Sequence, residues 1–136
     1  MTTKSNLNDL SYRITGCAIE VHKHLGPGLL ESVYQECMKK EFSLRGLDFK
    51  SQLIVPVSYK GLLIDADYRL DFLVNDAIVV ELKAMEGILP VHEAQLLTYM
   101  KLLKKPKGIL LNFNCTNMVK EGVKQMVNEY FSVLPG

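Results

Sequence analysis

The chain has 136 residues and a formal net charge of +1, with 48% hydrophobic and 23% charged residues. That length fits one domain over residues 1–136, and the composition excludes wholesale disorder. No apolar stretch approaches the roughly 20 residues that span a bilayer, and the start (MTTKSNLND) is unlike a secretory leader, so a cytoplasmic protein without a membrane partner is expected. The near-neutral charge argues against a protein that coats nucleic acid by bulk charge, but a nuclease stays compatible with it.

The first half of the chain predicts two helices and then strands. Apolar residues recur every three or four positions from about Asn8 to Leu25, and Gly26-Pro27-Gly28 ends this helix. A second helix is expected from near Leu29 to a stop at Gly46. Strand-forming residues follow over Leu53–Tyr59, with Pro56 favouring an edge or a bulge.

The second half alternates between strand and helix patterns. After a hairpin turn at Lys60-Gly61, residues 62–64 start the return, and further strands are expected over 68–74, 78–84 and 108–113. A helix is predicted from about Val91 to Lys104, and a closing amphipathic helix from Asn117 to Phe131. The order α-α-β-β-β-α-β-α predicts an α/β (α+β) fold with a central mixed sheet flanked by helices.

The predicted hairpin from Tyr68 to Ala84 holds most of the functional information. In each strand one face is wholly apolar and consists of even-numbered residues, so facing residues must have numbers that sum to an even total. A two-residue Asn75-Asp76 turn would break this rule, and we therefore predict a three-residue connection that adds Ala77. This register places Asp71 opposite Glu81, with Lys83 on the same face.

Carboxylates on facing strands lie about 5 Å apart at Cβ, close enough to share one divalent cation. Mg²⁺ (or Mn²⁺) would relieve their repulsion, polarise a phosphoryl oxygen and lower the pKa of bound water. Lys83 would orient that water or stabilise the developing charge. The alternative is a solvated salt-bridge cluster, in which Arg69 pairs with Asp71 and Glu81 pairs with Lys83.

The start of the second helix carries a motif. Gly28, Glu31 and Tyr34 have the spacing G-x-x-E-x-x-Y, which resembles the pattern of the GxxExxY protein family. That family is similar to a compact branch of the PD-(D/E)XK nuclease superfamily. The resemblance covers about residues 19–127 and implies a restriction-endonuclease-like αβββαβ core, with an extra N-terminal helix and a C-terminal helix. Leu70 departs from the pattern, because the superfamily has proline at this position.

The same resemblance implies roles for particular residues. Asp71 would be the superfamily's acidic residue, and Glu81 with Lys83 would form its E-x-K motif. Gln95 and Tyr99 have a Q-x-x-x-Y spacing similar to that of RecB-type nucleases, and they share one helix face. They would position the nucleic-acid backbone or the attacking water; a buried glutamine and a half-buried tyrosine are the alternative.

The resemblance also implies further ligands for the metal and the substrate. Glu31 and the Leu82 carbonyl would join Asp71 and Glu81 around the cation, although the helix dipole alone also favours an acid at Glu31. The expected substrate contacts are Arg69, Tyr34, Lys101 and Lys104. Tyr34 would line the pocket or pack beneath it, and the lysines belong to a cluster that either follows phosphates or is simply solvated.

The leading hypothesis is therefore a Mg²⁺-dependent nuclease that hydrolyses phosphodiester bonds of DNA or RNA. The alternative is a non-catalytic nucleic-acid- or protein-binding module on a nuclease-like fold. A third hypothesis is a hydrolase or lyase acting on a small phosphorylated substrate. A homodimer is compatible with the apolar segments, which do not require one.

Overall fold

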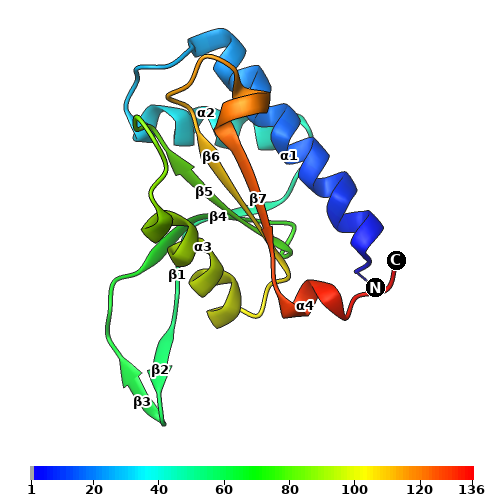
Figure 1. Cartoon of the computed structure of the whole chain (residues 1–136), viewed down its shortest axis with the longest axis vertical. Helices are drawn as coiled ribbons and strands as arrows, with labels where there is room; N and C mark the ends of the chain where they lie inside the picture. The colour runs from blue at the N-terminus through cyan, green and yellow to red at the C-terminus, as the bar shows by residue number, and fades with distance from the viewer. Residues whose placement is uncertain (1) are drawn as a thin grey trace.

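A computed structural model describes residues 2–136 (Figure 1). Five strands form one sheet in the order β1-β4-β5-β6-β7, in which β5 and β6 are parallel and the other neighbours are antiparallel. These strands are β1 (Phe49–Ile54), β4 (Arg69–Val74), β5 (Ile78–Lys83), β6 (Lys107–Asn112) and β7 (Val123–Val127). The chain therefore has the mixed sheet that its sequence predicts.

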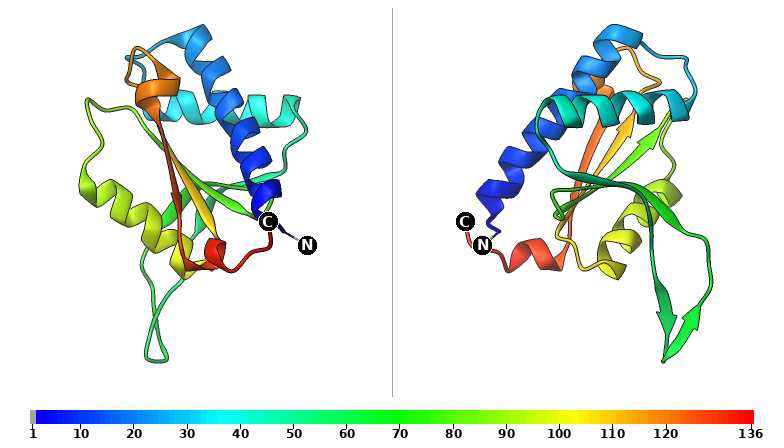
Figure 2. Two further views of the ribbon diagram at one scale, coloured as in Figure 1. Left: turned by 45° about the vertical axis from the view of Figure 1, so that its right-hand side comes forward. Right: turned by 180° about the vertical axis from the view of Figure 1, so that it is seen from behind.

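Helices cover both faces of this sheet (Figures 1 and 2). On one face, α1 (Lys4–Leu25) and α2 (Glu31–Leu44) bury an apolar stripe against even-numbered residues of β4 and β5, including Phe72 and Val80. On the other face, α3 (Pro90–Leu102) packs Leu96, Tyr99 and Met100 on a smaller apolar cluster. Because helices cover the sheet on both faces, a polar side chain on β5 that points away from α1 and α2 is also buried.

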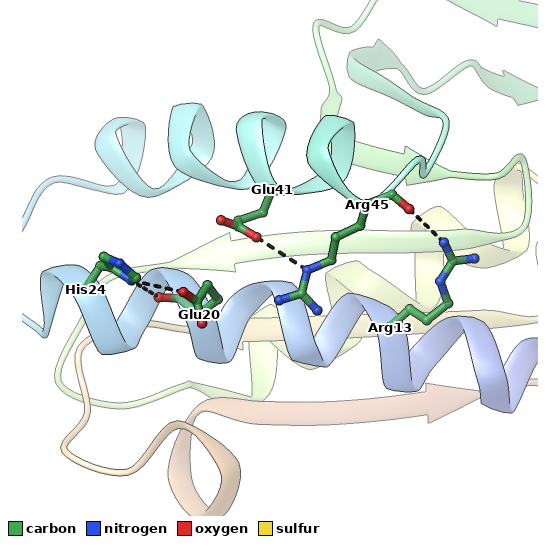
Figure 3. A network of polar contacts seen from close by, with 5 residues as sticks. All are labelled: Arg13, Glu20, His24, Glu41 and Arg45. Atoms are coloured by element: carbon green, nitrogen blue, oxygen red, sulfur yellow. Dashed lines mark hydrogen bonds and ion pairs between the residues drawn. The ribbon is translucent and has the colours of Figure 1, made fainter.

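Polar contacts join α1 to α2 along their outer surface (Figure 3). The Arg13 guanidinium donates to the carbonyl of Arg45 over 2.9 Å, and the Arg45 side chain pairs with Glu41 over 3.4 Å. Glu20 and His24 form a further pair on α1, with 3.3 Å between Oε1 and Nδ1. The Arg13 contact links the two helices, and the other two pairs lie within one helix or at its end.

The predicted three-residue connection between β4 and β5 is confirmed. Val74 pairs with Ile78, and the Ala77 amide donates to the Val74 carbonyl over 3.0 Å. Asn75 and Asp76 have φ of 49° and 54°, a left-handed conformation that these residue types adopt more readily than most. The turn thus sets the register that brings Asp71 and Glu81 to the same level.

Strict alternation fails at one point of the sheet edge. On β1, Phe49 packs in the apolar cluster under α1 and α2, whereas Leu53, four residues later, packs in the cluster under α3. On β4, Phe72 and Leu70 are divided between the same two clusters, although they are two residues apart. Between Phe49 and Leu53 on β1 lies Gln52, whose φ is 54°. A left-handed residue interrupts the alternation of side chains in its own strand, so β1 changes faces at Gln52. β4 changes faces at Asp71, the residue opposite Gln52.

The segment Leu53–Tyr59 is divided rather than continuous. β1 begins at Phe49 and ends at Ile54, and Pro56 separates it from β2 (Val57–Tyr59). β2 pairs with β3 (Leu62–Ile64) across the predicted Lys60-Gly61 turn, and this hairpin projects from the body of the protein (Figures 1 and 2).

The predicted closing helix over Asn117–Phe131 is wrong. The chain there forms a π-helical turn (Met118–Gly122), the edge strand β7, and a four-residue helix α4 (Glu129–Ser132). Met118, Gly122 and Met126 have helical spacing, but β6 is buried along its whole length and its outer edge needs a hydrogen-bonding partner. Tertiary context therefore overrides the local pattern. Within residues 2–136, no helix is both long enough and apolar enough to cross a membrane.

Candidate functional site

Asp71 and Glu81 meet at the end of the sheet where β5 finishes. The β4–β5 register, continued one step beyond Phe72 and Val80, places them opposite each other. Asp71 Oδ2 accepts a 2.7 Å hydrogen bond from the Leu82 amide. Both carboxylates are nearly covered, with 7% of Asp71 and 5% of Glu81 exposed. The solvated salt-bridge alternative is therefore wrong for this pair, because neither group lies in bulk solvent.

The hydrogen bonding of the Glu81 carboxyl is incomplete. Among the described residues, its buried Oε1 atom has no hydrogen-bond partner. Burial, and secondarily the charge of Asp71, raise the pKa of Glu81 to about 10, while the Lys83 ammonium acts in the opposite direction. The protein by itself thus holds a proton on Glu81, and a cation at this carboxyl would replace that proton.

Glu31 approaches the same place from α2, where it is the first helical residue. Partial burial and the charge of Asp71 raise the pKa of Glu31, and Lys83 lowers it. Lys83 thus acts electrostatically on both Glu31 and Glu81. Across residues 2–136, however, no three His, Cys, Asp or Glu side chains lie close enough together to hold a metal ion.

Two glutamines that the sequence did not single out hold Asp71. Gln35 donates to Asp71 Oδ1 over 2.9 Å, and Gln52 donates to the same atom over 3.4 Å. Gln52 also donates to Gln35 Oε1 over 3.2 Å, so the three side chains form one network. Gln35 lies four residues after Glu31 on the same helix face, a signal that could have identified it. The sequence contains no comparable signal for the positive φ of Gln52.

The G-x-x-E-x-x-Y motif divides into structural and site residues. Gly26 and Gly28 have φ of 68° and 97°, values that favour glycine. The Tyr34 hydroxyl donates to the Gly26 carbonyl over 2.6 Å and accepts from the Leu29 amide over 3.2 Å. Tyr34 is fully buried, so the expected substrate contact is wrong and Tyr34 packs beneath the site instead. Of the motif, only Glu31 reaches the carboxylates.

Gln95 and Tyr99 lie on α3, on the sheet face that carries Glu81. Tyr99 is buried in the α3 cluster, and its ring centroid lies 6.4 Å from that of Tyr68. Burial raises the pKa of the Tyr99 hydroxyl, and the charges of Glu81 and Asp71 act in the same direction. Gln95 is half-buried one helical turn earlier. Tyr99 is thus placed beside the two carboxylates.

The expected basic patch does not form at the site. α3 runs back along the sheet, so the residues after it return to the end opposite Lys83. Lys104 lines a pocket with Asp76 at the β4–β5 turn, and Lys105 pairs with Asp76 over 3.1 Å. Lys107 is buried, and its pKa is lowered by that burial. Lys104 thus lies at the β4–β5 turn rather than beside Glu81, and its role as a substrate contact stays a prediction.

Arg69 and Lys101 are both exposed. Arg69 lies two residues before Asp71 and pairs with Asp67 over 2.9 Å. Lys101 stands in the last turn of α3. Their roles as substrate contacts stay predictions.

The donor chemistry of the site fits a hard divalent cation. Two carboxylates converge, one with an unpartnered buried oxygen, and Mg²⁺ prefers one or two carboxylates and keeps several waters. The lysine beside them is suited to binding phosphate, and the carboxylate oxygens favour a hard cation over a soft one. Asp71 and Glu81 would hold the ion, with Glu31 on its outer side.

A protein-family model described as the PD-(D/E)XK nuclease superfamily matches residues 8–126, most of the chain. No curated protein and no solved structure gives a match. The matched range contains the five-stranded sheet apart from its last residue, the carboxylate pair with Lys83, and the helix with Gln95 and Tyr99. This match shows that the chain belongs to the PD-(D/E)XK nuclease superfamily, and the mixed sheet flanked by helices is consistent with it.

Proposed function

We propose that this protein is a Mg²⁺- or Mn²⁺-dependent nuclease that hydrolyses phosphodiester bonds of DNA or RNA. The observation that carries the proposal is the buried Asp71–Glu81 pair, in which one Glu81 oxygen has no partner among residues 2–136 and Lys83 stands two positions away. A buried carboxyl without a partner weakens the folded state, so its presence needs a compensating ligand. The G-x-x-E-x-x-Y motif supports assignment to the GxxExxY branch.

Each residue has a chemical task in this proposal. A divalent cation at the carboxylates would polarise a phosphoryl oxygen and favour ionisation of water. Lys83 stabilises the negative charge that develops on the phosphoryl group, in a setting where little water screens it. Gln35 and Gln52 fix the orientation of Asp71 Oδ1. Tyr99 and Gln95 line the α3 side, where the phosphate backbone would lie.

Plasmid DNA and a structured RNA are incubated in parallel with the protein, with Mg²⁺, Mn²⁺ or EDTA. We expect metal-dependent cleavage of at least one substrate, and a loss of about 10³-fold or more in Glu81→Ala and Lys83→Ala, as when a charge-stabilising group is removed. Lys120→Ala, at an exposed lysine, and Glu129→Gln, at an exposed acid, are matched controls that keep activity.

Circular dichroism and a urea titration establish that each variant folds. Cleavage that persists in both site variants at the wild-type rate would assign the activity to another site or to a contaminant. A small phosphodiester included in the screen tests the third hypothesis, because a hydrolase of small substrates would turn over that compound and leave both polymers intact.

One observation favours the non-catalytic alternative, a binding module on a nuclease-like fold. Within residues 2–136, no group of three potential ligands assembles around one point. A module of this kind would bind nucleic acid or protein without turnover, and divalent cations would leave its melting temperature unchanged. Thermal melts with and without Mg²⁺ separate the two functions directly.

A further inference from the structure

The β2–β3 hairpin extends away from the five-stranded sheet (Figures 1 and 2), and it carries exposed apolar side chains. Tyr59 is 60% exposed, Leu62 63% and Leu63 75%, and Ile64 is exposed beside them. The two strands pair only with each other. A two-stranded hairpin without a core gains little stability from such residues, which indicates that they serve an interaction.

The base of this hairpin borders the candidate site. β3 leads through Tyr68 and Arg69 into the strand that carries Asp71. The Tyr68 ring lies beside Tyr99, and the Val55 amide donates to the Tyr68 carbonyl over 2.8 Å. From Tyr68 to Gly61 the chain can extend roughly 23 Å at 3.3 Å per residue. A polymer bound at the carboxylates needs to extend only about that far to reach the tip.

The tip combines an aromatic ring, aliphatic side chains and one cation. Lys60 stands between Tyr59 and Leu62 in the sequence, and its Nζ lies 5.3 Å from the centroid of the Tyr59 ring. The acids Asp65 and Asp67 lie toward the base, and Asp67 already pairs with Arg69. Aromatic and aliphatic side chains stack on or insert between nucleobases, and a lysine beside them suits phosphate.

The charge of the whole chain favours this kind of contact. With a formal net charge of +1 and no basic patch at the site, phosphate attraction alone contributes little affinity. Contacts with base faces do not depend on net charge. They would supply the affinity for a polymer that the carboxylate site by itself lacks.

We propose that the β2–β3 hairpin holds the nucleic-acid strand that enters the Asp71–Glu81 site. Tyr59 and Leu62, which share one face of the hairpin, and Leu63, on the other face, would lie against its bases, with Lys60 near its phosphates. This inference rests on the proposed nuclease function. It assigns that site a polymeric substrate whose bases are accessible: a single strand, or a duplex unstacked by the hairpin.

The test uses the full chain with Mg²⁺ and phosphorothioate oligonucleotides of DNA and of RNA that contain 2-aminopurine. For the double variant Leu62→Ser/Leu63→Ser, we expect at least a tenfold rise in Kd, because an apolar contact with the bases is lost on each face of the hairpin. The fluorescence change that reports base unstacking should also disappear. Lys60→Ala should weaken binding a few-fold and reduce the salt dependence by about one phosphate contact.

The matched control is Tyr12→Ser, at an apolar residue that is 82% exposed on α1, and it should bind like wild type. Hydrolysis of bis-p-nitrophenyl phosphate, a phosphodiester without bases, should be equal in wild type and hairpin variants. An unchanged Kd in the double variant, or no binding by wild type, would overturn the inference. So would sedimentation that shows wild-type dimers and monomeric hairpin variants, because the surface would then bind a second copy.

The experiment separates this inference from the proposed function. If wild type binds the oligonucleotides through the hairpin but hydrolyses no phosphodiester, the hairpin contact stands and the nuclease function fails. If wild type cleaves both kinds of substrate and the double variant does so equally well, the function stands and the hairpin contact fails.

Discussion

The molecule contains two antiparallel hairpins that are locally alike and differ in their surroundings. In both, two consecutive turn residues have positive φ: Asn75 and Asp76 between β4 and β5, and Lys60 and Gly61 between β2 and β3. β5 is buried from Ile78 to Leu82, whereas every residue of β3 is exposed. Turn chemistry thus makes a hairpin in either place, and only packing decides what the hairpin can do.

Burial changes the chemistry of an acid in these hairpins. Asp65, after β3, is exposed to water. Glu81, on β5, is covered on both sides, and its pKa is raised to about 10. The same functional group is a solvated surface charge in one hairpin and a proton- or metal-binding site in the other. Four predictions test the comparison, from the largest expected effect to the smallest.

Removal of a large side chain should separate the two hairpins most clearly. Phe72 packs edge-on against Phe42 and Phe49, with ring centroids 5.2 and 5.7 Å away. Phe72→Ala should lower the free energy of unfolding by about 3–5 kcal/mol. Leu63→Ala should change it by less than about 0.5 kcal/mol. Urea titrations of both variants measure this difference, and similar losses would mean that β3 is covered in solution.

The metal-free protein should gain stability when the buried acid is replaced by Glu81→Gln. Because the folded-state pKa of Glu81 exceeds the unfolded value of 4.5, the wild type loses stability as the pH rises toward 10. The loss is at most about 1.4 kcal/mol per pH unit for one group. Melts in EDTA from acidic to alkaline pH should show the advantage of Glu81→Gln growing with pH.

Glu129→Gln, at an exposed acid, is the control and should follow the wild-type pH profile. A constant difference between Glu81→Gln and wild type across the pH range would show that Glu81 is already ionised in the folded protein. Added Mg²⁺ should raise the melting temperature of wild type and leave that of Glu81→Gln almost unchanged.

The glutamine network should matter for the cation more than for the fold. Gln35→Ala removes the 2.9 Å hydrogen bond to Asp71 Oδ1 and should weaken Mg²⁺ binding by about 10- to 100-fold. Gln125→Ala, at an exposed glutamine on β7, is the matched control. Calorimetric titration measures both affinities. Equal Mg²⁺ affinity in Gln35→Ala and wild type would limit Gln35 to a structural role.

The turns themselves should give the smallest effect. Asn75→Ala places alanine at φ 49° and removes the 3.0 Å hydrogen bond from the Asp48 amide, so we expect a cost of about 1–2 kcal/mol. Gly61→Ala, at φ 84°, introduces similar strain in a hairpin that unfolds locally. Its melting temperature should stay within a degree or two of wild type. An equal decrease in both variants would contradict the independence of the two hairpins.

Local patterns predicted a large part of this fold and its site. The period-two pattern of 68–84 predicted β4, β5, their three-residue connection and the facing of Asp71 and Glu81, because a buried sheet face tolerates only one register. The helical stripe of Asn8–Leu25 predicted α1 in the same way. The closing helix failed because Met118, Gly122 and Met126 have helical spacing while the unpaired edge of β6 requires a strand.

The sequence by itself determined the elements around the site, their order and the identity of the acidic pair, since these follow from burial periodicity and turn chemistry. Only the tertiary structure decided that Gln35 and Gln52 hold Asp71, that Tyr34 is fully buried, and that Lys104 lies at the far end of the sheet. Those outcomes depend on contacts between distant segments, and on the left-handed residue Gln52, which lies opposite Asp71 where β1 and β4 change faces. The local sequence pattern does not predict such contacts, because their energies arise only after the sheet and helices have packed.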